Sequence, residues 1–291
     1  MGRARQVAGS RILITGASQG IGRALALSAA ARGGRVLAVA RSGELLEQLA
    51  DEARSRGYSV EVQVGDITNP DDRVRMIERC RELFDGLDVL VNNAGVGATG
   101  HFAEGKPEIL RQIMEVNFFG TSEMIRAALP LLQASDRAAI INISSIAGKR
   151  GLPARSEYCA SKFAVQGLSQ AIRAEFIKLG IHVLTVCPGL TQTNFSQNLL
   201  DRRALKQYDH MRGMTAEQVA EATWDAMERG KREIWLTFNG KLLIWANRLV
   251  PFLVNFITAQ LVRHLFRDER RARRAKANQP MQPEDAQTVT R

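Results

Sequence analysis

Cysteine and histidine are both scarce in this chain of 291 residues, which holds three Cys and four His. No two cysteines form a CxxC pair, so the sequence indicates neither a disulfide framework nor a thiol redox motif. A reducing intracellular compartment fits this usage. The histidines are scattered without metal-ligand spacing, so no metal site is predicted.

The sequence also lacks the marks of a secretory signal and of a nucleic-acid-binding motif. The opening residues, MGRARQVAGSRILITGA, contain no apolar run long enough for a signal, so we expect a cytoplasmic protein. The net charge is +10, and the run from Arg263 to Lys276 alone carries seven basic and two acidic residues. Because few aromatic residues interleave with these charges, nucleic acid is not an expected partner. An anionic membrane surface is the preferred partner for this run, with a solvated helix end as the alternative.

Short β-branched runs alternate with helical patterns over most of the chain. The strand-like runs cover residues 11–17, 35–41, 59–66, 87–95, 138–145 and 181–189. The helical patterns cover residues 20–33, 43–57, 71–86, 107–134 and 156–180. Strands separated by helices of this length form right-handed βαβ units, so the sequence predicts an α/β fold with a parallel sheet. We expect one domain over residues 1–238.

Residues 239–276 form an apolar and basic extension, and residues 277–291 are predicted to be a disordered tail. The stretch from Leu242 to Val262 is long enough to cross a bilayer and carries one charge, Arg248. However, an intramembrane Arg costs about 2.5–3.5 kcal/mol, and Pro251 and several amides break the apolar face. We therefore prefer a helix lying in the membrane interface, with residues 242–276 making peripheral contact. Packing on the protein's own domain or on a second subunit stays open.

The segment TGASQGIG follows the first expected strand and opens the first expected helix. Its glycines, Gly16, Gly20 and Gly22, permit a tight turn, close approach of the backbone to a pyrophosphate, and close packing of helix on strand. The free N–H groups and the dipole of the helix then favour the phosphate charge. The intervening residues expected to share this site are Ser18, Gln19 and Ile21.

The end of the second expected strand has no carboxylate. A site for NAD usually carries Asp or Glu there to accept a hydrogen bond from the ribose 2′-hydroxyl. Here the order is Ala40, Arg41, Ser42. A guanidinium suits a 2′-phosphate, so NADP(H) is favoured and NAD(H) is the alternative. Arg41 could instead pair with Glu44 on the surface.

Several motifs occur together in one order over about residues 10–195. They are TGASQGIG, GDIT, NNAG, EVNFFGT, INISSIAG, YCASK and CPGLTQT. In this order the chain resembles the short-chain dehydrogenase/reductases. The resemblance implies a Rossmann-type, doubly wound fold with a seven-stranded parallel sheet, and a homodimer or homotetramer. It also implies hydride exchange between a nicotinamide and a carbonyl or alcohol. The long extension is loosely similar to the dehydrogenase/reductase-member-seven type, whose substrates are hydrophobic.

Tyr158 and Lys162 stand four residues apart on an expected helix, so they share one face. A phenol with a pKa near 10 is a poor acid–base group at neutral pH, and an adjacent ammonium lowers that pKa. The pair is therefore predicted to exchange a proton with the substrate oxygen. The resemblance implies that Ser145 hydrogen-bonds that oxygen and that Asn117 holds a water in a proton relay to the lysine. A purely structural role for Asn117 stays open.

The resemblance also extends the cofactor site. It places Asp66 and Ile67 against the adenine, and Asn93, Ala94 and Gly95 along the adenosine ribose. It assigns Lys162 a bond to the nicotinamide ribose. It places four further residues at the nicotinamide and its amide, namely Pro188, Gly189, Thr191 and Thr193.

The substrate pocket is expected between the turn after residue 145 and residues 190–214, which read as a mobile lid with Leu190, Phe195 and Leu199. These apolar residues suit a lipid-like, acyl or steroid-like ketone. The basic rim formed by Lys149, Arg150 and Arg155 suits instead the phosphates of a carrier-bound 3-oxoacyl thioester. A nucleotide sensor without catalysis is a further alternative, although Ser145, Tyr158 and Lys162 are all present.

Overall fold

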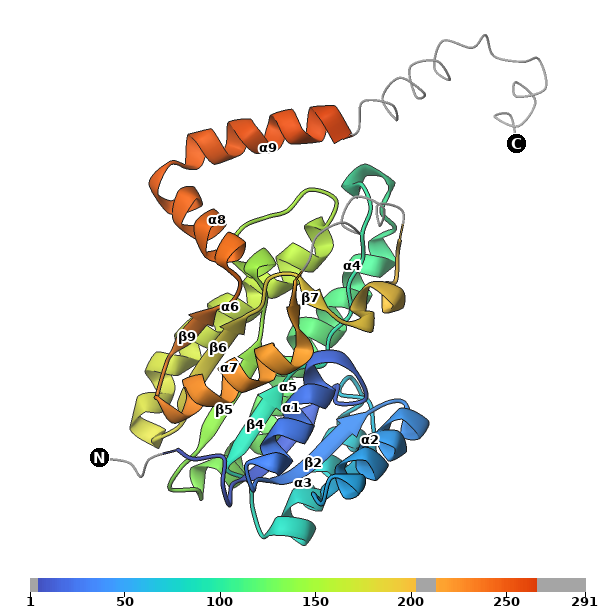
Figure 1. Cartoon of the computed structure of the whole chain (residues 1–291), viewed down its shortest axis with the longest axis vertical. Helices are drawn as coiled ribbons and strands as arrows, with labels where there is room; N and C mark the ends of the chain where they lie inside the picture. The colour runs from blue at the N-terminus through green and yellow to red at the C-terminus, as the bar shows by residue number, and fades with distance from the viewer. Residues whose placement is uncertain (1–4, 203–212, 266–291) are drawn as a thin grey trace, which may run out of the picture. The chain divides into compact units, whose positions relative to one another are not determined.

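The computed structural model describes residues 5–202 and 213–265. The chain divides into two compact units, Met1–Ile244 and Trp245–Arg291. The first unit is an α/β fold in which a parallel sheet lies between two layers of helices, as Figure 1 shows and as the sequence predicts.

Seven parallel strands form the main sheet in the order β3-β2-β1-β4-β5-β6-β9. Their bounds are β1 Arg11–Thr15, β2 Arg35–Ala40, β3 Val60–Val64, β4 Val89–Asn92, β5 Ala139–Ile143, β6 His182–Cys187 and β9 Glu233–Trp235. The strand order reverses between β1 and β4, because β2 and β3 are added on one side of β1 and the later strands on the other. In such sheets ligands bind at this switch point, outside the carboxyl ends of the strands. Six strands match the runs seen in the sequence. The seventh has three residues, too few to show a periodic pattern.

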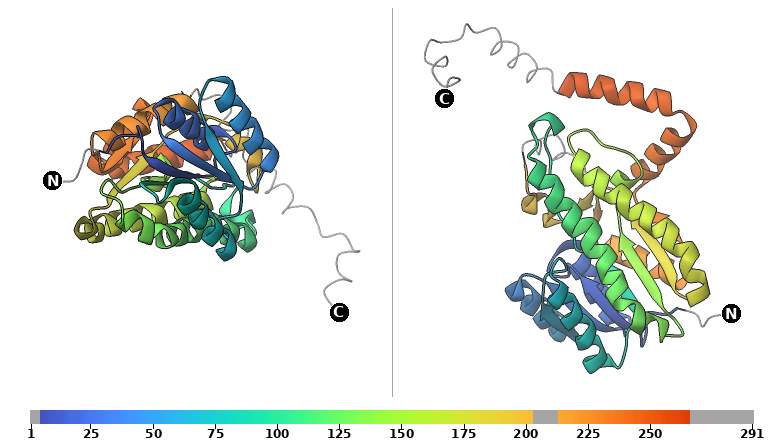
Figure 2. Two further views of the ribbon diagram at one scale, coloured as in Figure 1. Left: turned by 90° about the horizontal axis from the view of Figure 1, so that it is seen from below. Right: turned by 180° about the vertical axis from the view of Figure 1, so that it is seen from behind.

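Helices cover both faces of the sheet, which Figure 2 shows from below and from behind. One face carries α1 Gly20–Ala31, α2 Gly43–Ser55 and α7 Ala216–Glu228, and the other carries α3 Pro70–Phe84, α5 Thr121–Gln133 and α6 Ser156–Glu175. Each layer packs its own buried apolar cluster against the sheet. This burial of both sheet faces explains why the inner strands read as largely continuous apolar runs. The edge strand β3, VEVQV, alternates instead and is mostly only partly buried.

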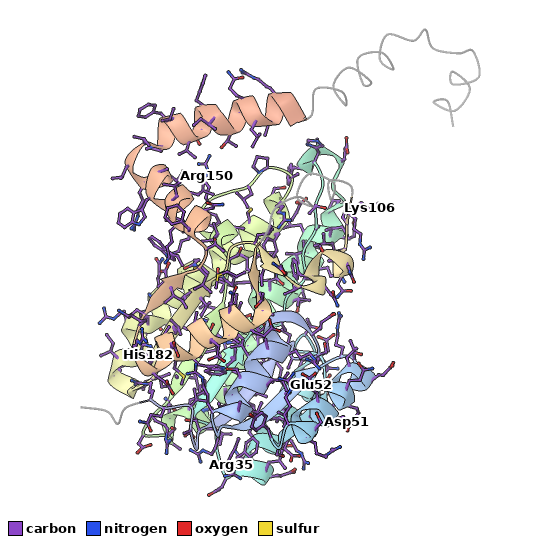
Figure 3. All side chains as sticks on the ribbon, in the orientation of Figure 1. Arg35, Asp51, Glu52, Lys106, Arg150 and His182 are labelled. Atoms are coloured by element: carbon purple, nitrogen blue, oxygen red, sulfur yellow. The ribbon has the colours of Figure 1, made fainter. Side chains whose placement is uncertain are left out.

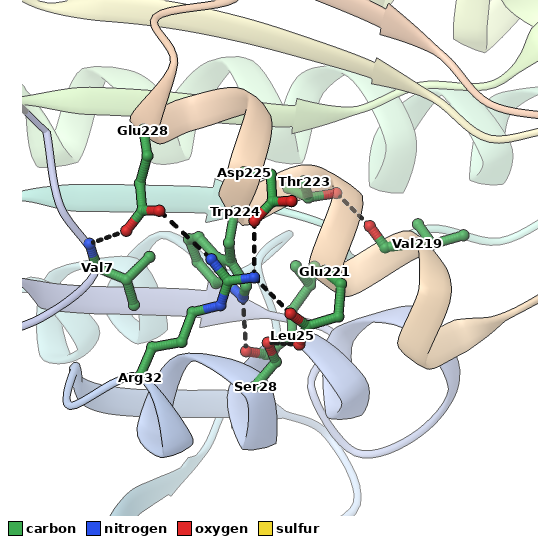
Figure 4. Close-up of polar contacts among 10 residues, drawn as sticks. All are labelled: Val7, Leu25, Ser28, Arg32, Val219, Glu221, Thr223, Trp224, Asp225 and Glu228. Atoms are coloured by element: carbon green, nitrogen blue, oxygen red, sulfur yellow. Dashed lines mark hydrogen bonds and ion pairs between the residues drawn. The ribbon is translucent and has the colours of Figure 1, made fainter.

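Polar contacts join α1 to α7, which leads into the last strand (Figure 4). The buried Trp224 ring donates its Nε1–H to the Leu25 carbonyl oxygen at 3.3 Å. Arg32 pairs with Asp225 at 2.8 Å and also with Glu221. These contacts fix α7 against α1. Because β9 follows α7 directly in the chain, they help to hold β9 at the sheet edge beside β6.

The prediction of a long helical region over residues 107–134 is confirmed, with one irregular turn in its middle. The structure has α4 Pro107–Met114, a wider π-helical turn over Glu115–Gly120, and then α5. Asn117 lies in this turn, and its side chain hydrogen-bonds both backbone groups of Val96. Such turns are rare and occur often at functional sites.

Two helices follow the sheet, α8 Phe238–Leu249 and α9 Pro251–Leu265. The apolar stretch over residues 242–262 is therefore divided, because the residue before a proline disfavours helical backbone. Within the described residues no helix is long and apolar enough to cross a membrane. The remainder of the predicted extension, residues 266–276, and the predicted disordered tail, 277–291, lie outside the described residues.

Candidate active site

A cleft of about 870 Å³ lies along the carboxyl ends of the strands. Every cofactor and catalytic residue predicted from the sequence lines it, except Gly22 and Asn117. Figure 3 shows which end of the first unit the carboxyl ends of the strands face. Arg35, at the start of β2, lies at the opposite end of this unit from Arg150 and Lys106. The volume falls within the range that cofactor and ligand pockets have in proteins.

Gly16 and Gly22 of the glycine loop have no room for a side chain. A Cβ on Gly16 would lie 2.6 Å from the Ala94 Cα, and one on Gly22 would lie 2.3 Å from the Gly16 carbonyl oxygen. Gly16 and Gly20 also have positive φ angles, of 65° and 57°. Helix α1 begins at this loop with no acidic residue in its first turn. Its free N–H groups and dipole therefore fit the negative charge of a pyrophosphate.

Replacing Gly22 by Ala should destabilise the domain and weaken nucleotide binding, because the added methyl group meets backbone that cannot move aside. We expect a loss of about 1–3 kcal/mol from such overpacking. Gly167→Ala is the matched control, because a Cβ there meets nothing within 4 Å inside α6. It should be neutral or stabilising by up to about 1 kcal/mol. Thermal unfolding of both variants checks this, and an equally stable Gly22→Ala would contradict the tight cradle.

Arg41 lies at the end of the cleft formed by the tips of β2 and β3. Its side chain is 66% exposed, and its Nη1 lies 3.9 Å from the Asp66 Oδ2. The surface pairing with Glu44 that the sequence left open is thus replaced by a loose pairing with Asp66. Exposed pairs of this kind contribute about 0–1 kcal/mol, so a phosphate could draw the guanidinium away from Asp66.

Tyr158 and Lys162 lie on the first turns of α6, and both line the cleft. The Lys162 Nζ lies 5.8 Å from the centroid of the Tyr158 ring and donates to the Ile143 carbonyl oxygen at 2.9 Å. Burial lowers the pKa of Lys162 to about 8. Burial raises the pKa of Tyr158, opposed by a hydrogen bond with Ser145 and by the charge of Arg155.

The direction of the Tyr158 pKa differs from the simple sequence argument, which expected the lysine to lower it. The phenolate loses its hydration in the cleft, and this loss outweighs the favourable contacts. The lysine ammonium is directed at a backbone carbonyl instead of the phenol oxygen. In this arrangement Tyr158 is a neutral phenol at pH 7 and therefore holds the proton that a developing alkoxide needs.

Two serines follow β5, and their side chains make different contacts. The Ser144 hydroxyl donates to the Lys162 carbonyl oxygen at 3.2 Å, so it packs against α6. The Ser145 Oγ accepts from the Ala147 N–H at 3.1 Å and hydrogen-bonds Tyr158. Ser145 is thus the serine placed to share a substrate oxygen with Tyr158.

Asn117 is 1% exposed, and hydrogen bonds engage both ends of its amide. Its Oδ1 accepts from the Val96 N–H at 2.8 Å, and its Nδ2 donates to the Val96 carbonyl and to the Ser161 Oγ, each at 2.9 Å. These contacts tie the loop after β4 to α6. They support the structural reading of its side chain, and the water relay to Lys162 stays a prediction.

Part of the predicted lid is described, and both of its ends are anchored. β7 Thr191–Gln192 pairs with β8 Met214–Thr215, and the Leu200 N–H donates to the Gly97 carbonyl at 2.9 Å. The Phe195 ring lies 5.7 Å from the Tyr158 ring, centroid to centroid. Residues 203–212 of the predicted lid lie outside the described residues. The anchored part therefore forms an apolar wall beside Tyr158.

Thr237 is a residue that sequence reasoning missed. It joins β9 to α8 with a φ of 69°, which is rare for a β-branched residue. A Cβ on Gly189 would lie 2.3 Å from the Thr237 Oγ1, so this threonine packs directly on the turn that borders the cleft. No signal could have revealed it, because left-handed turns are normally read from glycine or asparagine.

Comparisons with known proteins agree with this geometry. The family model for short chain dehydrogenases matches residues 10–204. Dehydrogenase/reductase SDR family member 7B of Rattus norvegicus is 31% identical over 263 residues, 87% of this chain and 81% of that protein. A short-chain dehydrogenase structure from Burkholderia cenocepacia J2315 in complex with NADP has a TM-score of 0.75 and 27% identity, and the match covers 87% of this chain and 98% of that one. One from Burkholderia phymatum in complex with NAD has a TM-score of 0.79 at 23% identity, over 85% and 96% of the two chains.

Proposed function

Because this chain belongs to the short-chain dehydrogenase/reductase family and is an NAD(P)-dependent oxidoreductase, we propose that it interconverts a hydrophobic ketone or aldehyde and the alcohol, using NADP(H). The observation that carries the proposal is the meeting of Tyr158, Lys162 and Ser145 in the same cleft that the glycine loop lines. An acid–base group, a cation and a hydroxyl donor are the parts that carbonyl reduction requires.

Each side chain has a distinct task in this proposal. The nicotinamide, when bound, supplies the hydride to the carbonyl carbon or accepts it in reverse. Tyr158 would give its proton to the carbonyl oxygen, and the Ser145 hydroxyl would donate a hydrogen bond to the same atom. Lys162 keeps its proton below about pH 8, and this charge favours the phenolate that remains.

We choose NADP(H) over NAD(H) because of the residues at the end of the cleft where the adenosine would bind. Arg41 and Ser42 line it there, and the tip of β2 carries no carboxylate for a ribose 2′-hydroxyl. A guanidinium binds a 2′-phosphate through two parallel hydrogen bonds. Reduction is the proposed direction because cells keep the NADP pool reduced.

We propose a hydrophobic substrate because the apolar side chains of Leu190, Phe195 and Leu199 line the cleft beside Tyr158. A peripheral contact with a membrane through residues 242–276 is part of the same proposal. It is supported by large apolar side chains that are exposed on the extension helices, among them Trp245, Phe252 and Phe256. Such a surface suits the interface of a bilayer. Assembly as a homodimer or homotetramer is likewise proposed from the family alone.

Oxidation of NADPH and NADH at 340 nm, measured against carbonyl compounds of graded chain length, tests the proposal. The panel includes alkanones, steroid ketones, aldehydes and 3-oxoacyl thioesters, each with and without anionic vesicles. We expect activity with NADPH that rises with chain length and with vesicles. Activity confined to thioesters would favour the 3-oxoacyl reductase alternative. NADPH binding without turnover of any compound would favour the nucleotide sensor.

A further inference from the structure

The turn that follows β5 sets the position of the Ser145 hydroxyl. Ser145 is the N-cap of a short 3₁₀ turn, Ile146–Gly148, and Lys149 closes this turn. The Ser145 Oγ accepts a hydrogen bond from the Ala147 N–H at 3.1 Å, and the Lys149 N–H donates to the Ile146 carbonyl oxygen at 2.9 Å. The position of the hydroxyl that is proposed to meet the substrate oxygen therefore depends on what holds this turn in place.

Lys149 connects this turn to β9, the edge strand of the sheet. The sequence placed Lys149 and Arg150 on the basic rim of the substrate pocket, but neither residue lines the cleft. Instead the Lys149 Nζ pairs with the Glu233 Oε1 at 2.7 Å, and the two side chains are only 15% and 20% exposed. Because salt screens a covered pair less than an exposed one, this pair is a stronger tie than an ordinary surface ion pair.

Glu233, the first residue of β9, is itself held in place by its neighbours. Its backbone pairs with Thr185 of β6 in the sheet. Its Oε1 also accepts from the Trp235 indole N–H, and the Cys187 Sγ lies 3.9 Å from the same oxygen. Burial raises the pKa of Cys187 to about 12, and the charge of Glu233 acts in the same direction, so the thiol keeps its proton and can donate it. The carboxylate therefore has a fixed place between β6, β9 and the turn.

The turn also has an apolar anchor, which is independent of the ion pair. Ile146 belongs to a small buried cluster with Cys187 and with Ile244 of α8. A Cβ on Gly240 would lie 2.9 Å from the Ile146 Cγ1, so the start of α8 packs closely on this side chain. These contacts should keep the turn folded when the ion pair is lost. The pair then determines how precisely the turn is held, and not whether it forms.

We propose that Glu233 and Lys149 are positioning residues for carbonyl reduction, because their ion pair holds the turn in the geometry that directs the Ser145 hydroxyl at the substrate oxygen. This inference rests on the proposed function. Neither residue lines the cleft, and Glu233 lies outside residues 10–204, which the family model matches. A misplacement of about 1 Å, caused by a change far from the chemistry, can cost about 10²-fold in rate. An ion pair outside the cleft can therefore matter for turnover.

The test combines substitutions of the ion pair with Ser145→Ala. Glu233→Gln removes the negative charge at nearly constant shape, Lys149→Met removes the positive charge, and Lys149→Arg keeps a cation. Asp225→Asn is the matched control, because it also turns the carboxylate of an ion pair into an amide. Asp225 pairs with Arg32 at 2.8 Å, between α7 and α1, and it does not line the cleft. For each variant we measure kcat with the best ketone of the panel, the Kd of NADPH and the Tm.

We expect Glu233→Gln and Lys149→Met each to lower kcat by about 10–100-fold and to leave the Kd of NADPH unchanged. Lys149→Arg should keep most of the activity, and Asp225→Asn should keep all of it. In the Ser145→Ala background the same two substitutions should lower kcat no further, because they act through the hydroxyl that is already absent. An unchanged kcat in either variant, or an equal fall with and without the Ser145 hydroxyl, overturns the proposal.

The two proposals fail separately. If the wild type reduces ketones and the ion-pair variants do so equally well, the positioning role is wrong and the reductase stands. If no compound is reduced, the proposed function fails, and hydrogen exchange of the Ala147 N–H, which donates to the Ser145 Oγ, still tests the hold on the turn. Faster exchange in Glu233→Gln but not in Asp225→Asn supports it. Exchange that Glu233→Gln leaves unchanged, or that both variants accelerate equally, overturns it.

Discussion

Tyr158→Phe is expected to lower kcat by about 10²–10⁴-fold, because it removes the hydroxyl that donates the proton in the cleft. The phenylalanine ring keeps the contact with Phe195 and remains partly buried. NADPH should therefore bind the variant within about twofold of wild type, since the glycine cradle and Arg41 are unchanged. Turnover is measured with the best ketone of the panel, and binding by the fluorescence of NADPH.

Tyr58→Phe is the matched control for this substitution. Tyr58 stands between α2 and β3, is 37% exposed and does not line the cleft. Removing its hydroxyl should leave both turnover and binding as in wild type. If Tyr158→Phe kept most of its activity, another group would have to supply the proton. If it lost NADPH binding as well, the residue would be a structural part of the nucleotide site.

Arg41→Asp is expected to reverse the cofactor preference from NADPH toward NADH. The substitution removes the partner of the 2′-phosphate, worth about 1.5–3 kcal/mol or about 10–150-fold in Kd, and adds repulsion. The new carboxylate can accept a hydrogen bond from the 2′-hydroxyl of NADH. The ratio of the two Kd values, measured on one preparation, reports the change directly.

Arg54→Asp controls for the change in net charge. Arg54 is exposed on α2, where it pairs with Asp51, and it does not line the cleft. Its substitution should leave the NADPH to NADH ratio as it is in wild type. An unchanged ratio in Arg41→Asp would remove Arg41 from the adenosine site, and Ser42 would then be the first residue to examine.

The sheet could be predicted because parallel strands are buried on both faces. Five of its strands appear as largely apolar runs, β3 appears as an alternating run, and the glycine spacing marks the junction of β1 and α1. β9 was not located, because three residues do not make a pattern and its place depends on pairing with β6. The same limit applies to the π-helical turn at Asn117, which depends on its contacts with Val96.

The candidate site was predictable where spacing fixes geometry. Tyr158 and Lys162 share a face because they are four apart on one helix, and Ser145 follows from motif order. The sequence did not show which basic residues of the predicted rim line the cleft, since nothing in the sequence distinguishes Lys149, Arg150 and Arg155. Only their contacts distinguish them: Lys149 is paired with Glu233, whereas Arg155 reaches the cleft.

The central claim is that hydride passes between NADP(H) and a carbonyl carbon in the cleft that holds Tyr158. The most direct measurement uses NADPH in which both hydrogens at C4 of the nicotinamide ring are replaced by deuterium. It is oxidised with the best ketone of the panel, and NMR locates the label in the product. The account predicts one deuterium on the carbon that bears the new hydroxyl group, and labelled product formed about 10²–10⁴-fold more slowly by Tyr158→Phe. Oxidised cofactor with no deuterium on that carbon would contradict it.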